Sequence, residues 1–153
     1  ASEFWLPSDK ELSITEIIKS FNVNMDGITD EALKADDPQV RQAVVEFNEG
    51  SFSQSGLEQF QKKYGLRVDP VTKVVGTEET EESNGEADLD VQTLTAMAQG
   101  AQTWSFVFDS TASWIDVVET ILKNKDSPRL ISCCWSAVES TMGRSAVLAA
   151  TTQ

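Results

Sequence analysis

Short apolar segments alternate along this chain with stretches of helical periodicity, an order that few folds accommodate. Strands are expected at residues 66–75, 103–108 and 129–135, and the last of these is nearly all apolar. Helices are expected at residues 55–65, 88–100, 114–122 and 137–151. Short apolar strands that alternate with helices are typical of a parallel sheet that is covered on both faces. The pattern therefore predicts an α/β fold.

Two further helical stretches are expected in the first third of the chain. Apolar residues have helical spacing over residues 14–21, and residues 22–37 are expected to form a connecting loop. Asp37 and Pro38 are typical of a helix start, so a helix is predicted from there to Gly50. Its apolar stripe consists of Val40, Ala43, Val44 and Phe47. A capping box at residues 55–58 is expected to begin the following helix.

Composition and length limit the possible functions. The 153 residues include 25 acidic and 12 basic side chains, for a net charge of -13, and no histidine. The charge argues against nucleic acid and anionic membranes as partners, and the missing histidine excludes imidazole-based triads within this chain. No run of about 18 apolar residues is present, so no transmembrane helix is expected. One domain is predicted over residues 1–153, with residues 1–13 as an extended lead-in.

Glu86 and Asp90 are the candidate catalytic residues. They follow an acidic loop at residues 77–85 and lie four residues apart, so a helix places both carboxylates on one face. Asp88 points away on the same helical wheel and is expected to be a solvated charge, whereas Glu86 and Asp90 are expected to face inward. A carboxyl group crowded by other carboxylates keeps its proton to a higher pH. This is one way in which a chain without histidine could provide a general base.

The spacing of these two acids also allows three other interpretations. Acidic residues in the first turn of a helix are favoured by the helix dipole without any further role. Clustered oxygens can bind calcium, although the alternating ligand pattern of a calcium loop is missing here. A glycosidase uses two carboxylates across a sugar, but no run of exposed aromatic residues accompanies the pair.

Residues 85–108 (GEADLDVQTLTAMAQGAQTWSFVF) closely resemble the serine-carboxyl peptidases, the sedolisin family that includes kumamolisin and tripeptidyl peptidases. Residues 41–47, 52–60 and 129–135 resemble further parts of that catalytic domain. The resemblance implies a subtilisin-like, doubly wound parallel sheet of which this chain contains only the N-terminal half. It also implies hydrolysis of peptides or proteins, by an endopeptidase or a tripeptidyl peptidase.

The resemblance assigns roles to particular residues. Glu86 corresponds to the general base that activates a serine, and Asp90 to the group that orients it. A glutamate that must both accept and donate a proton works best near its own pKa, which implies an acidic pH optimum. Cys134, Trp135 and Ser136 correspond to the strand that binds substrate, where the family usually has Ser-x-Gly. Trp104 and Phe106 are expected to be core residues.

Other parts of the family pattern are missing from this chain. The nucleophilic serine, the aspartate that supports the oxyanion and the calcium site would lie beyond Gln153. The expectation is a processed, two-chain enzyme whose second polypeptide supplies the serine, the aspartate and the calcium ligands, with no calcium on this chain. Such an enzyme is expected to be secreted or lysosomal or vacuolar. The alternatives are a non-catalytic homologue that acts as a binding module, and an acidic calcium-binding module.

The two cysteines, Cys133 and Cys134, are adjacent in the sequence. A disulfide between neighbouring residues is strained, so no internal disulfide is expected. Both side chains are predicted to be buried in the strand at residues 129–135.

Overall fold

The computed structural model describes residues 40–47, 51–76 and 85–136, together with residues 16, 17, 20 and 83. Residues 16, 17 and 20 are helical, as the spacing over residues 14–21 predicts. The predicted loop at 22–37, the acidic stretch at 77–82 and the predicted helix at 137–151 lie outside the described residues. Within the described part, no helix is sufficiently long and apolar to span a bilayer.

In the described part of the chain, four parallel strands form one sheet in the order β2-β3-β1-β4. The elements follow one another as β1 (Arg41–Glu46), α2 (Gln54–Lys63), β2 (Val71–Gly76), α3 (Gly85–Met97), β3 (Gln102–Val107), α4 (Trp114–Lys123) and β4 (Leu130–Ser132). The predicted α/β fold is therefore confirmed, with strands β2 to β4 and helices α2 to α4 close to their expected positions.

The prediction of a helix from Asp37 to Gly50 is wrong, because residues 41–46 form the inner strand β1. Apolar residues at i, i+3, i+4 and i+7 also fit a strand that is buried on both faces. Val44 packs toward one face of the sheet, whereas Ala43 and Val45 pack toward the other. Consecutive β-branched valines favour a strand, and pairing with both β3 and β4 completes its backbone hydrogen bonds.

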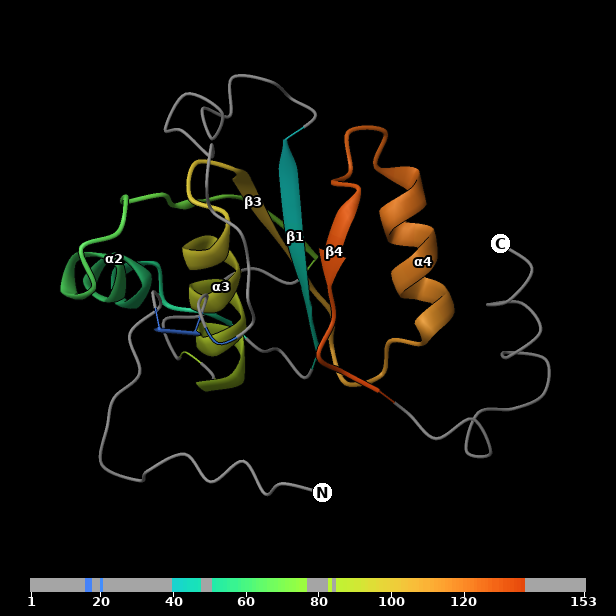
Figure 1. Ribbon diagram of the computed structural model, residues 1–153. Helices are drawn as coiled ribbons and strands as arrows, with labels where there is room; N and C mark the ends of the chain where they lie inside the picture. The colour runs from blue at the N-terminus through green and yellow to red at the C-terminus, as the bar shows by residue number, and fades with distance from the viewer. Residues whose placement is uncertain are drawn as a thin grey trace, which may run out of the picture.

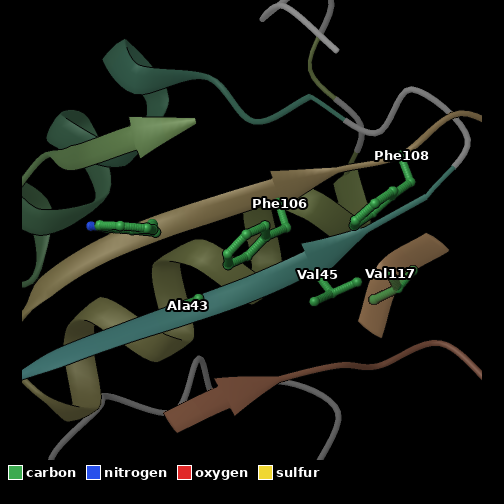
Figure 2. Packing of buried hydrophobic residues seen from close by; sticks show 6 residues of the cluster. Ala43, Val45, Phe106, Phe108 and Val117 are labelled. Atoms are coloured by element: carbon green, nitrogen blue, oxygen red, sulfur yellow. The ribbon is translucent and has the colours of Figure 1, made fainter. Parts of the chain in front are cut away.

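Helices cover both faces of the sheet. Helices α2 and α3 lie on one face and α4 lies on the other (Figure 1). Under α2 and α3, the first core cluster contains Val44, Phe52, Leu57, Ala87 and Val91. Under α4, the second cluster contains Ala43, Val45, Trp104, Phe106, Phe108 and Val117, most of which Figure 2 labels. Trp104 and Phe106 are core residues, as predicted.

The start of α2 differs from the predicted capping box at residues 55–58. The N-cap is Ser53, whose hydroxyl accepts a hydrogen bond from the backbone N–H of Gly56 at 3.0 Å. A capping box is present instead at the start of α4, between Ser113 and Asp116. Asp88, expected to be a solvated charge, is half-buried and accepts a hydrogen bond from the Ser53 N–H at 2.7 Å. It therefore ties the first turn of α3 to the start of α2.

The carboxyl end of β2 requires glycine. Gly76 has a φ of 114°, a backbone conformation that side chains disfavour. A Cβ atom built there would lie 1.9 Å from the carbonyl oxygen of Val107 on β3. The close approach of the two backbones is therefore possible only without a side chain at this position.

Candidate functional site

The predicted site residues meet at the carboxyl edge of the sheet. In a parallel α/β fold the helices run against the strands, so helix N-termini and strand C-termini share this edge, where ligands usually bind. Glu86 and Asp90 lie in the first two turns of α3, and residues 134–136 begin two positions after the end of β4 at Ser132. Strand β4 lies parallel to its neighbour β1, so both strands end at this edge.

Glu86, Asp90 and Cys134 form a compact cluster. A carboxylate oxygen of each acid and the Sγ of Cys134 all lie within 4.8 Å of one another. Asp90 is buried, with 9% of its surface exposed, whereas Glu86 is exposed. The expectation that both acids face inward therefore holds for Asp90 only. Carboxylates and a thiol are also groups that can bind a metal ion.

A third carboxyl group, that of Glu46, lies behind this pair. Glu46 is the last residue of β1 and is completely buried. Burial raises its pKa from 4.5 to about 7, and the neighbouring carboxyls of Asp90 and Glu86 add to this effect, while a hydrogen bond from Trp135 opposes it. Glu46 is therefore protonated in acid. Because the protonated group is neutral, the three crowded carboxyl groups do not all carry a charge in acid.

Trp135 connects the segment after β4 to this buried acid. Its indole Nε1 donates a hydrogen bond to Glu46 Oε2 at 3.3 Å. The ring is half-buried and packs edge-on against Phe47, with ring centroids 5.8 Å apart. Within the part of the chain that the structure describes, the other oxygen of Glu46, Oε1, has no partner with hydrogen-bond geometry. Trp135 thus holds the end of β4 in place over the acidic cluster.

The two cysteines are free and exposed, so the prediction that they are buried in the strand is wrong. The strand β4 ends at Ser132, and both cysteines lie beyond it. No disulfide joins them, as expected. A hydrogen bond with Asp90, followed by burial and by the charges of Asp90, Glu86 and Glu46, raises the pKa of the Cys134 thiol. Cys134 is therefore a neutral thiol rather than a ready nucleophile.

Ser136 is exposed and ends the described part of the chain after β4. Among the described strands, β4 pairs only with β1, so no described strand covers its other edge, and an extended peptide can add to an edge of this kind. Cys134, Trp135 and Ser136 are thus brought to the same edge as Glu86 and Asp90.

Sequence reasoning missed Glu46 as part of the site. In the sequence, Glu46 belongs only to the family-like segment at residues 41–47, where the periodicity predicts a helix. The available signal was a charged residue at the end of an apolar run, Ala43 to Val45, since a buried strand that ends in an acid places that acid at the ligand-binding edge. Recognising it required β1 to be identified as a strand.

A separate cavity of about 510 Å³ lies near the carboxyl ends of β2 and β3, beside the start of α4. Its two acids, Asp109 and Asp116, have lowered pKa values because they accept hydrogen bonds from Thr111 and Ser113, respectively. Both carboxylates are therefore used in local turns and caps. None of the predicted site residues lines this cavity.

No protein-family model matches this chain. Tripeptidyl-peptidase 1 of Dictyostelium discoideum is 27% identical to it over 106 residues. The aligned part is 67% of this chain but only 18% of the relative, so the chain matches less than a fifth of that protein. The chain is therefore distantly similar to a tripeptidyl peptidase, which points at most to the family that its sequence pattern resembles.

Proposed function

We propose that this chain is part of an acid-acting serine-carboxyl peptidase and supplies the acidic half of its catalytic site. The observation that carries the proposal is the meeting of Glu86 and Asp90 with the segment after β4, in front of the buried acid Glu46. The similarity to a tripeptidyl peptidase supports the same reaction class.

In the proposed reaction, Glu86 accepts the proton of a serine hydroxyl as that oxygen attacks the peptide carbonyl. Glu86 then returns the proton to the leaving amine, which needs a pKa near the working pH. Asp90 lies one helical turn away and positions Glu86. Glu46 is protonated below about pH 7 and relieves the repulsion among the three groups, so acid favours the working state.

The substrate is proposed to bind as an extended peptide beside the segment that follows β4, and to pair with the backbone of residues 134–136. Main-chain pairing of this kind tolerates changes of side chain. Ser136 stands where the family usually has glycine, so its side chain narrows the space for the substrate.

The serine and the oxyanion aspartate are proposed to come from a second polypeptide or segment, which also carries the expected calcium site. An acidic compartment or the exterior of the cell would suit such an enzyme. Mass spectrometry of the native protein should identify a companion chain with a Gly-Thr-Ser loop.

The assay is hydrolysis of a peptide library at acidic pH by the native protein and by two variants. Glu86→Gln should lose at least about 100-fold in kcat, the lower end of general acid–base contributions. Glu119→Gln is the matched control, because Glu119 is half-exposed on α4 and pairs with Lys123 away from this site. Full activity of Glu86→Gln would refute the base assignment. A folded protein with no companion serine and no hydrolysis would indicate a non-catalytic binding module.

A further inference from the structure

The cluster of Glu86, Asp90 and Cys134 brings together a set of ligands that a general base does not need. Two carboxylates come from consecutive turns of α3, and the thiol comes from the segment after β4, far away in the sequence. The three donor atoms lie within 4.8 Å of one another although they come from two separate parts of the chain. Such a cluster is expected at a metal site, whereas acidic residues that only favour a helix N-terminus need no thiol from another segment.

The kinds of ligand select the cation. Calcium and magnesium prefer all-oxygen sites, whereas zinc accepts thiolate and carboxylate ligands together. Tetrahedral zinc, with bonds of about 2.0 to 2.3 Å, places its ligands roughly 3.5 Å apart. Glu86 and Cys134 are exposed, so small rotations of their side chains can bring the three atoms about 1 Å closer.

Glu46 is an independent sign that the site is short of a positive charge or a donor. Its side chain is completely buried, and its Oε1 has no hydrogen-bond partner among the described residues. It lies against Asp90, the most buried of the three ligands. A buried polar atom without a partner is costly, and a cation held by the adjacent Asp90 would offset that cost.

We propose that Glu86, Asp90 and Cys134 form a zinc site, and that zinc bound there inhibits the enzyme reversibly. Binding releases the thiol proton of Cys134 to solvent and leaves one coordination position for water or Glu46. A carboxylate that binds zinc cannot accept a proton from serine, so Glu86 is removed from catalysis. Zinc binding stands on the geometry alone, whereas inhibition rests on the proposed function.

The first test is titration of the purified metal-free protein with cobalt(II), followed by displacement with zinc. A thiolate ligand gives cobalt an intense near-ultraviolet absorption band, which a carboxylate-only site lacks. Cys134→Ser should abolish this band and weaken zinc binding by at least about tenfold, the effect expected for the loss of even an outer-shell partner. Cys133→Ser is the matched control, since Cys133 is also exposed and free but lies outside the cluster.

Glu86→Gln provides a second variant, because an exposed side chain can be changed with little effect on folding. It should keep the cobalt–thiolate band but bind zinc less tightly. The proposal is overturned if the wild-type protein shows no such band, or if the two cysteine variants behave alike.

The second test compares peptide hydrolysis with and without zinc within each variant. Zinc should inhibit the wild-type and Cys133→Ser proteins, and the same concentration should inhibit Cys134→Ser much less. Equal inhibition of both cysteine variants would refute the inhibitory role even if cobalt binds. If no variant hydrolyses peptides, the proposed function fails while the cobalt result still decides the zinc site.

Discussion

Replacing Glu46 with glutamine should change how the stability of this protein depends on pH. Glu46 is fully buried, and its pKa is raised from 4.5 to about 7, chiefly by burial. An acid with a raised pKa favours folding while it is protonated. The favourable contribution is complete below about pH 4.5, the unfolded value, and is lost as the pH rises through the folded value of about 7.

The magnitude follows from the two pKa values. At roughly 1.4 kcal/mol for each pH unit between them, ionisation of Glu46 costs the folded state about 3 kcal/mol above neutral pH. Glutamine has nearly the same shape, can still accept the hydrogen bond from Trp135, and does not ionise. As the pH rises from acid to neutral, the free energy of unfolding of the variant should therefore increase by about 3 kcal/mol relative to that of the wild type.

The assay is the free energy of unfolding from denaturant titration at several values from about pH 4 to about pH 8, for both proteins. Subtracting the free energy of unfolding of the wild type from that of the variant at each pH removes the contribution of the other acids, which titrate in both proteins. Glu119→Gln serves as the control, because loss of its exposed ion pair with Lys123 should change stability by less than about 1 kcal/mol. Curves for Glu46→Gln and the wild type that stay parallel within about 0.5 kcal/mol would refute the argument.

Three further substitutions test the fold by the same unfolding measurement. Gly76→Ala should destabilise the protein by at least about 2 kcal/mol, because of backbone strain and the clash with Val107. It should cost more than Gly65→Ala, because Gly65 also has a positive φ but a Cβ atom built there would meet no other atom within 4 Å. Equal effects of the two would show that close backbone contact is not the cause. Ser113→Ala should cost about 1 kcal/mol by removing the N-cap of α4, and a neutral result would mean that the capping box contributes nothing. Phe106→Ala should cost about 3 to 5 kcal/mol because it empties the centre of the core, and a loss below about 1 kcal/mol would contradict the described packing.

Local sequence patterns were sufficient to predict most of the helices and the pairing of Glu86 with Asp90. The amphipathic stripe of α4 and the spacing of Glu86 and Asp90 follow from the geometry of a single helix, whatever that helix packs against. The apolar run that became β3 likewise needed no knowledge of its neighbours to be identified as a strand. The α/β class followed from the order of these elements.

Long-range contacts decided the remaining features. The stripe from Val40 to Phe47 fits a helix and a buried strand equally well, and only pairing with β3 and β4 makes it the strand β1. Glu46 is the last residue of that strand, so its burial and its raised pKa could not be predicted while the segment was interpreted as a helix. Cys134 reaches Asp90 only because β4 lies beside β1. Periodicity records which residues one element buries, whereas a pKa or a cluster of ligands depends on what the rest of the chain brings to the same place.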